Sequence, residues 1–340
     1  MRVTALLALA CGAVTCALAA VDPGTLPAEK ARLAPQSLLL DIANAGSRLV
    51  AVGERGHVLF SDNRGQMWTQ AAGVPTQELL TAVCFSDEKH GVAVGHDEIA
   101  LVTSDAGNSW QRTHYAPEAR QPLLDVLCNG SDVIAVGAYG TYIASADRGV
   151  TWQERKFEAS PPPATKNAAT PAQPADEYDD GLGADFHLNR IVGASGSRLY
   201  IAAEAGHLYR SDDAGMTWSE LPSPYEGSFF GILPLDGETL LAYGLRGHLF
   251  RSEDGGYSWQ RIPVETEAML NDAVRLPKDA VAVVGLNGTL LLSQDDGRSF
   301  KLHQQPDRKG ISALRAYGVS ELVTVGEVGI KSIPLEAPKQ

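Results

Sequence analysis

An eight-residue stretch that recurs six times constrains this chain more than any other feature. Its clearest copy runs from Ser211 to Trp218 and has the pattern Ser/Thr-x-Asp-x-Gly-x-Ser/Thr-Trp. The other copies are Ser61 to Trp68 (with Asn63 and Met67 at variant positions), Thr103 to Trp110, Ser145 to Trp152, Ser252 to Trp259 and Ser293 to Phe300. All five tryptophans of the 340-residue chain stand at the last position of a copy. The copies therefore belong to one repeated structural unit.

The spacing of these copies predicts the architecture. Their shared glycines are Gly65, Gly107, Gly149, Gly215, Gly256 and Gly297, at intervals of 42, 42, 66, 41 and 41 residues. A period of about 40–45 residues is typical of a four-stranded propeller blade. The single long interval indicates one insertion.

Each repeat has the same order of expected elements. An apolar strand comes first, then a strand that ends in Gly, such as residues 49–53. A tight turn follows, as in Gly53-Glu54-Arg55-Gly56, which is hairpin chemistry. A third strand leads into the eight-residue copy, whose Trp opens the fourth strand. Helical periodicity is absent, so the chain is predicted to be all-β.

The seventh repeat lacks its last strand. Residues 311–317, 321–326 and 329–333 supply three strands, and residues 25–35 are free to supply the fourth. Pairing of the N- and C-terminal strands would close the ring and remove exposed sheet edges. We therefore expect a seven-bladed β-propeller with four-stranded blades; six blades with an appendage is the alternative.

The remaining segments are expected to lie outside the repeats. Residues 1–20 have a positive start, an apolar run and a small-residue cleavage site, as in a secretory signal peptide. We expect a periplasmic or otherwise exported protein with no transmembrane segment after cleavage. The propeller then spans residues 21–340, with a Pro-rich, acidic insertion at residues 157–186 between blades three and four. This insertion is expected on the face of the Gly-x-x-Gly turns.

The net charge and the cysteine content exclude several classes of function and fold. The formal net charge of −13 argues against binding to nucleic acid or to an anionic membrane surface. Only Cys84 and Cys128 follow the expected signal peptide, so the chain is not a disulfide scaffold. Both lie on innermost strands, where we expect buried apolar residues. A bridge requires Cβ atoms about 4 Å apart, and the sequence leaves this open.

The repeated stretch is interpreted as a folding device. Its Asp accepts backbone N–H groups, its Gly takes a positive φ, and its Trp covers the turn. This structural role is assigned to Asp105, Gly107, Trp110, Asp147, Gly149, Trp152, Asp213, Gly215, Trp218, Asp254, Gly256 and Trp259. Calcium is the alternative, but each copy offers only one or two carboxylates. We expect no metal and no cofactor.

These repeats resemble the Asp-box, or bacterial-neuraminidase-repeat, class of propellers. The form Val-Gly-x-x-Gly-x-Leu-x-x-Ser-x-Asp-x-Gly-x-Thr-Trp, best seen in residues 243–259, is most similar to photosystem II assembly and stability factors. That resemblance implies a non-catalytic, protein-binding scaffold. An Arg before the box Ser is part of the similarity; it is present as Arg210 and Arg251 and is replaced elsewhere by Phe60, Val102, Ala144 and Leu292. Relatives outside photosynthesis resemble accessory proteins of envelope systems such as exporters.

A glycan-active enzyme or a carbohydrate-binding propeller is the alternative of a different class. Sialidase chemistry needs three clustered arginines, a Tyr–Glu pair and an Asp. The family signature Arg-Ile-Pro occurs as residues 261–263, but at the end of a blade, where it is interpreted as ordinary strand sequence. His57, His207 and His248 share one register of the repeat, which favours a consensus position over a metal site. We expect that the protein is not an enzyme.

Two surfaces remain as candidate sites. The innermost strands carry polar residues that we expect to form a ring at one mouth of the axial channel: Asp41, Thr81, Asp125, Asn189 and Asn271. The face of the Gly-x-x-Gly turns is the expected contact with a protein partner, a membrane or envelope complex. The candidate contact residues are Glu54, Arg55, His96, Asp97, Tyr139, Tyr178 and Arg246.

Overall fold

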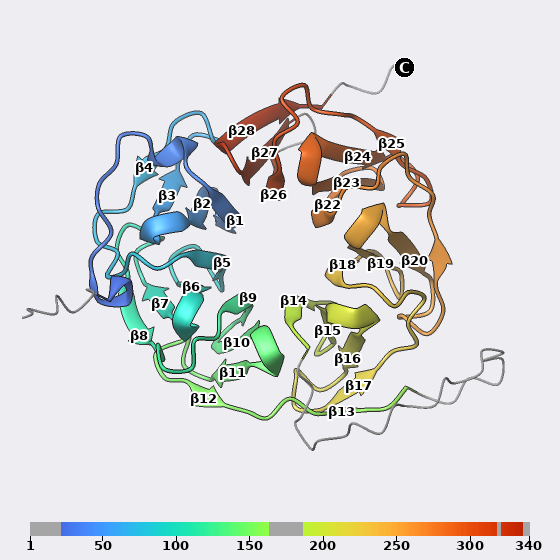
Figure 1. The fold of residues 1–340 in the computed structure, drawn as a ribbon, viewed down its shortest axis with the longest axis horizontal. Helices are drawn as coiled ribbons and strands as arrows, with labels where there is room; N and C mark the ends of the chain where they lie inside the picture. The colour runs from blue at the N-terminus through green and yellow to red at the C-terminus, as the bar shows by residue number, and fades with distance from the viewer. Residues whose placement is uncertain (1–21, 163–185, 318–320, 336–340) are drawn as a thin grey trace, which may run out of the picture.

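Seven β-sheets are arranged as blades around a central axis (Figure 1). This computed structural model describes residues 22–162, 186–317 and 321–335. The prediction of an all-β, seven-bladed propeller is confirmed. The predicted signal peptide lies outside the described residues. Among the residues described, no helix is long and apolar enough to cross a membrane.

Strands repeat in the same order in every blade, from the axis outward. The innermost strands are β1 (Leu39–Ala45), β5 (Leu80–Phe85), β9 (Leu123–Asn129), β14 (Leu188–Gly193), β18 (Phe229–Pro234), β22 (Leu270–Leu276) and β26 (Ile311–Tyr317). The second strands are β2 (Arg48–Gly53), β6 (Gly91–Gly95), β10 (Asp132–Gly137), β15 (Leu199–Ala203), β19 (Leu240–Gly244), β23 (Ala280–Gly285) and β27 (Glu321–Gly326). The third strands are β3 (Val58–Ser61), β7 (Ala100–Thr103), β11 (Tyr142–Ser145), β16 (Leu208–Ser211), β20 (Leu249–Ser252), β24 (Thr289–Ser293) and β28 (Gly329–Pro334). The outer strands are β4 (Thr69–Gln70), β8 (Gln111–His114), β12 (Gln153–Glu154), β17 (Trp218–Glu220), β21 (Gln260–Arg261) and β25 (Lys301–Leu302).

The hydrophobic core lies between the blades. Each second strand is buried along nearly its whole length because neighbouring blades cover both of its faces, which is why these strands read as continuous apolar runs. The layer between blades 7 and 1 contains Leu39, Ile42 and Leu49 together with Val323 and Val325. Full burial of each such side chain contributes about 1.5–3 kcal/mol. Blades 7 and 1 therefore pack as neighbours and the ring is closed.

The predicted closure by strand pairing is wrong. The seventh sheet, β26-β27-β28, has three strands among the described residues, and residues 25–35 form no strand in it. This segment instead follows the outer edge of blade 1, where the Ala28 N–H donates to the Val74 carbonyl at 2.8 Å and Lys30 Nζ donates to the Gln70 carbonyl at 2.6 Å. It contains the 3₁₀ turns η1 (Pro23–Thr25) and η2 (Ala34–Gln36), each with a proline in its first turn. Proline removes a ladder donor, which explains why the segment is not a strand.

A disulfide joins blades 2 and 3, a possibility that the sequence left open, so the expectation that Cys84 and Cys128 are buried apolar residues is wrong. Cys84 on β5 and Cys128 on β9 are bonded, with Cα atoms 5.7 Å apart. Innermost strands of neighbouring blades converge toward the axis, and this brings the two side chains within bonding distance. The bridge lies in the wall of the central cavity.

The predicted insertion begins inside blade 4. Residues Ala159–Ser160 form β13, which pairs in parallel with the outer strand β17 as a fifth strand. Just before it, Phe157 is 8 % exposed and packs against Tyr142, Tyr209 and Trp218. The first residues of the segment 157–186 are therefore part of the packed blade. Residues 163–185 lie outside the described part of the chain.

Candidate functional site

Short 3₁₀ turns connect the second and third strands and repeat around one face of the ring (Figure 1). They are η3 (Glu54–Gly56), η4 (His96–Glu98), η5 (Ala138–Gly140), η6 (Glu204–Gly206), η7 (Leu245–Gly247) and η8 (Leu286–Gly288). The middle residue of each turn has a φ of 51° to 56°, which is left-handed. In η7 the third residue, Gly247, also has a positive φ, and a Cβ there would lie 2.0 Å from the Thr266 carbonyl oxygen. The conformation of each turn thus fixes the position from which its middle side chain projects.

The candidate contact residues lie at these turns, but the structure does not bring them together. Glu54 and Arg55 belong to η3 in blade 1, His96 and Asp97 to η4, Tyr139 to η5, and Arg246 to η7 in blade 5. Tyr178 lies outside the described residues. Tyr139 is 58 % exposed and meets the ring of His187 edge-on, with centroids 4.9 Å apart. Their role in partner binding stays a prediction.

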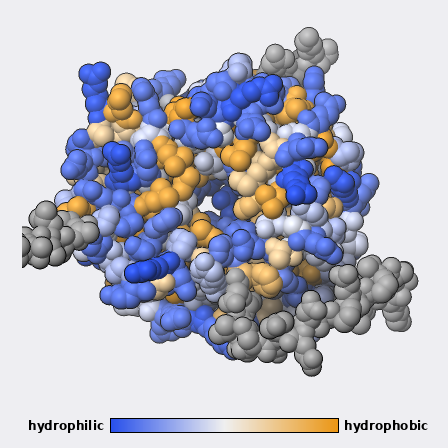
Figure 2. Space-filling view, viewed as in Figure 1, coloured by the Kyte–Doolittle hydropathy of each residue, from blue (hydrophilic) through white to orange (hydrophobic). Residues whose placement is uncertain are grey.

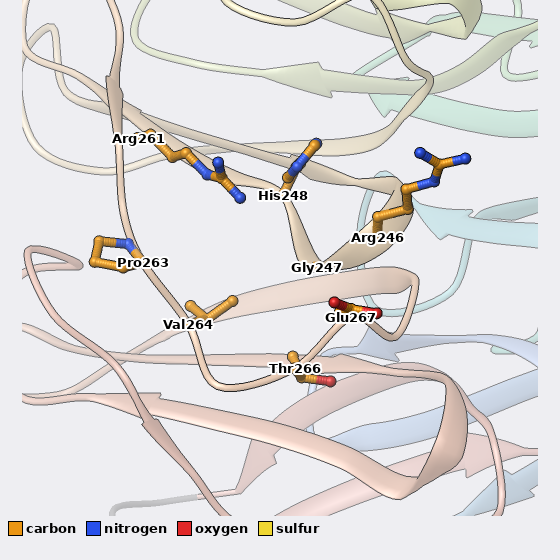
Figure 3. A pocket seen from close by; sticks show the side chains of 8 residues that line it. All are labelled: Arg246, Gly247, His248, Arg261, Pro263, Val264, Thr266 and Glu267. Atoms are coloured by element: carbon orange, nitrogen blue, oxygen red, sulfur yellow. The ribbon is translucent and has the colours of Figure 1, made fainter.

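Among the candidate residues, Arg246 lines a large cleft. The cleft has a volume of about 710 Å³ and lies between η7 and residues 261–267, which lead from β21 of blade 5 toward β22 of blade 6 (Figure 3). Arg246, His248 and Arg261 lie along one side. The other side is formed by Pro263, Val264, Thr266 and Glu267. The cleft therefore combines two guanidinium groups, an imidazole and one carboxylate.

The basic groups of this cleft lack partners in the described part of the chain. Arg246 and Arg261 have no carboxylate within 4.0 Å there. The Nδ1 atom of His248 is buried and has no hydrogen-bond partner. Burial, followed by the positive charges of Arg261 and Arg246, lowers the pKa of His248. The site is consequently set up for a negative charge that the chain itself does not supply.

Comparison with blade 4 shows that the cleft of blade 5 lacks a carboxylate beside its histidine. In blade 4, His207 occupies the same place after the turn, and its Nδ1 lies 2.6 Å from Glu220 Oε1. Glu220 pairs with Tyr209 in the sheet just as Arg261 pairs with Phe250 in blade 5. Arg261 is therefore the structural counterpart of Glu220, and blade 5 has a cation where blade 4 has the carboxylate.

The opposite face carries the eight-residue boxes. In the box of blade 4, Asp213 Oδ1 accepts the Thr217 N–H at 2.9 Å and Oδ2 accepts the Thr217 hydroxyl at 2.6 Å. Ser211 Oγ accepts the Gly215 N–H at 2.9 Å, and Gly215 has a φ of +84°. Trp218 is 6 % exposed. The Ser211 and Asp213 side chains are satisfied within the turn, whereas the buried Nε1 of Trp218 has no partner in the described residues. The hydrogen bonds of Ser211 and Asp213 account for these two motif positions by folding alone.

The axial channel holds a buried charge network. Figure 2 shows the molecule hollowed at the axis, and a cavity of about 320 Å³ there is lined by Asp41, Asp125, Arg190 and Arg315, among others. Arg190 contacts Asp272 and lies 3.7 Å from Asp125. Arg315 lies 3.3 Å from Asp272 and 3.8 Å from Asp41. Each aspartate also accepts a backbone N–H of the next blade, from Val83, Ile191 or Leu314.

The predicted polar ring is wrong in its register. Asp41 and Asp125 are the third residues of their strands, whereas Thr81, Asn189 and Asn271 are the second residues of theirs. The three shallower residues donate to main-chain carbonyls of the next blade instead. Sequence reasoning missed the partners that complete the network: Arg190, Asp272 and Arg315.

The network makes stability depend on pH through Asp125. Burial raises the pKa of this carboxyl to about 6 despite the nearby Arg190. Because the folded state then holds this proton more tightly than the unfolded chain, the contribution of Asp125 to the free energy of unfolding falls as the pH rises from about 4 to about 6.

We expect Asp125→Asn to remove that fall. Relative to the wild type, the variant should gain on the order of 2 kcal/mol between pH 4 and pH 7. Urea unfolding at pH 4, 5, 6 and 7 measures the difference. A constant offset between the two proteins across this range would contradict the assignment to Asp125.

The described residues do not form the arginine cluster of a sialidase. Both channel arginines that line the cavity, Arg190 and Arg315, are engaged by aspartates. Arg261 of the Arg-Ile-Pro sequence lies on β21, the outer strand of blade 5, away from the axis. No three His, Cys, Asp or Glu side chains in the described residues are grouped so that they could hold a metal ion.

Comparison with known proteins supports the sequence resemblance. Residues 60–184 match the sequence model of the family described as photosynthesis system II assembly factor YCF48. A solved structure of YCF48 bound to D1 peptide has a TM-score of 0.68 at 16% identity, covering 92% of this chain and 98% of that one. The chain resembles YCF48 in sequence over residues 60–184 and in fold over most of its length. This confirms the resemblance seen in the repeats.

Other comparisons show how widely the fold is shared. YCF48 from Cyanidioschyzon merolae has a TM-score of 0.65 at 14% identity, covering 88% of this chain and 96% of that one. The WD40 propeller domain of Doa1 reaches 0.65 at 11% identity, covering 93% and 97%. No curated protein matches the sequence significantly. Since fold likeness extends to unrelated propellers, the YCF48-like character rests on the repeats and the family match as well.

Proposed function

We propose that this protein is an exported, non-catalytic propeller that binds a segment of a membrane or envelope protein and assists assembly of its complex. The observation that carries the proposal is the likeness to YCF48, one structure of which holds a D1 peptide. A rigid ring whose turns present varied side chains suits recognition of a polypeptide.

The partner is proposed to be an envelope transporter of a non-photosynthetic bacterium, not photosystem II. In the photosystem factors that this chain resembles, basic surface residues are implicated in partner binding. Here Arg210 contacts Asp212, and Arg251 lies 2.9 Å from Asp296. These pairs neutralise the two arginines of the repeat, and the chain as a whole carries a formal charge of −13. Both features favour a different partner.

Export is supported by two features of the chain. Residues 1–20 have the composition of a signal peptide. The bond between Cys84 and Cys128 belongs in an oxidising compartment, because cytosolic thiols are kept reduced.

The test of function is co-purification from solubilised envelope membranes with a tagged chain. We expect a defined membrane complex to be captured by the wild type and to be reduced at least several-fold by Arg55→Gln combined with Arg246→Gln on the turn face. The matched control is Gln66→Glu with Val150→Glu on the box face, which lowers the net charge by the same amount. Equal capture by both variants would overturn the turn face as the contact, and no captured membrane protein would overturn the proposed function.

A further inference from the structure

The cleft of blade 5 is a ligand site with a definable chemistry. Three basic groups face a volume of about 710 Å³, which is within the range of pockets that hold small ligands or peptide side chains. Arg198, Arg210 and Arg251 of the neighbouring blades contact carboxylates. In the cleft, Arg246 and Arg261 do not. Both are exposed, so their guanidinium groups are available to pair with a carboxylate of a ligand.

We infer that this cleft binds a carboxylate group of a peptide, held by Arg246, His248 and Arg261. The carboxylate takes the place beside His248 that the Glu220 side chain takes beside His207 in blade 4. A guanidinium group recognises a carboxylate through two parallel N–H donors. The buried Nδ1 of His248 has no partner within the described residues, and a proton on this imidazole adds a third positive charge beside the two guanidinium groups.

The rest of the cleft fits a polypeptide ligand. Pro263 and Val264 supply an apolar wall beside the basic groups, and Thr266 supplies a hydroxyl. Glu267 disfavours a second negative charge on that side, so the cleft selects a single carboxylate next to an apolar side chain. The inference rests on the proposed function for the peptide nature of the ligand, while the carboxylate follows from the blade comparison.

Binding should strengthen as the pH falls. In the free cleft, burial, Arg261 and Arg246 lower the pKa of His248, whereas a bound carboxylate raises it. The charged and titratable groups that surround the imidazole are Arg246 on η7, Arg261 on β21, Glu267 before β22 and Tyr225 before β18, whose ring lies 4.0 Å away edge-on. Because the bound state holds the extra proton, affinity rises several-fold from pH 7.5 to pH 5.5.

The experiment is NMR titration of histidine-labelled full chain with three acetylated hexapeptides of Ala, Ser and Leu. One has a free carboxyl terminus and no acidic side chain, one is amidated and carries a central Glu, and one is amidated and uncharged. The His248 signal is assigned from His248→Gln. A saturable shift of this signal in the millimolar range with the first peptide, the second or both supports the site, and the pattern tells a terminal carboxylate from a side-chain one.

Two variants make the outcome decisive. Arg261→Glu places a carboxylate where blade 4 has Glu220, so it should keep the fold and weaken peptide binding at least tenfold. Arg148→Glu makes the same charge change at an exposed position in the box of blade 3, on the opposite face, and should leave binding within twofold. The proposal is overturned if the uncharged peptide or inorganic phosphate shifts His248 as strongly, if no peptide shifts it, or if Arg261→Glu binds like the wild type.

Failure here can be separated from failure of the proposed function. Capture of a membrane complex by the wild type without any carboxylate response at His248 removes only the cleft inference. Carboxylate binding without capture removes the proposed function and leaves the chemistry of the cleft.

Discussion

Replacing Asp272 by Ala is expected to lower the free energy of unfolding by about 3–5 kcal/mol. Asp272 is 1 % exposed, contacts both Arg190 and Arg315, and accepts the Leu314 N–H at 3.0 Å. Its removal leaves two guanidinium groups in the channel with only the longer contacts to Asp41 and Asp125. An incompletely paired buried charge costs far more than the loss of an exposed pair.

Guanidinium denaturation at pH 7 measures the loss, with Asp236→Ala as the matched control. Asp236 is also paired with an arginine, Arg275, but its side chain is 73% exposed, so its removal should leave the midpoint almost unchanged. Asp272→Asn separates charge from shape, because the amide oxygen can still accept the Leu314 N–H. A loss below about 1 kcal/mol for Asp272→Ala would mean that Asp41 and Asp125 hold both arginines without it.

The architecture was predictable from the sequence because every blade packs in the same way and carries similar residues at equivalent positions. The Ser and Asp of each box form hydrogen bonds within the turn, as Ser211 and Asp213 do, so each copy of the turn carries the same short pattern. Ring closure was not predictable in the same way. The contact between blades 7 and 1 is made by apolar side chains such as Leu39 and Val323, which look like any other blade core.

The channel was predictable only in part because the strand starts were misaligned by one residue. Asp41 is the third residue of β1 and Thr81 the second of β5, and a one-residue offset changes the direction of a strand side chain. The partners Arg190 and Arg315 come from blades 4 and 7 and pair with Asp272 of blade 6, so Arg190 contacts a blade that is not its neighbour. Contacts of this kind depend on the closed ring and carry no local signal.

The cleft could have been found in the sequence from a difference between repeats that lies outside the turn residues. His57, His207 and His248 share one register, and the residue thirteen positions later is Gln70, Glu220 or Arg261. At this position the charge changes from negative in blade 4 to positive in blade 5, although both blades keep the histidine. A deviation of this type within a repeat points to a site more directly than the exposed residues of the turns, which vary among the blades without a common pattern.

Replacing both Cys84 and Cys128 by Ala is expected to lower the free energy of unfolding by about 2–4 kcal/mol, since the bond closes a long loop and restricts the unfolded chain. Both side chains are half-buried, so Ala avoids leaving a hydroxyl without a partner. Urea unfolding of the oxidised wild type and the double variant gives the difference, and the wild type with dithiothreitol is the control that changes no residue. The reduced wild type should resemble the variant. If all three proteins unfold at one midpoint, the bond does not form in solution, and the stability argument for an oxidising compartment is lost with it.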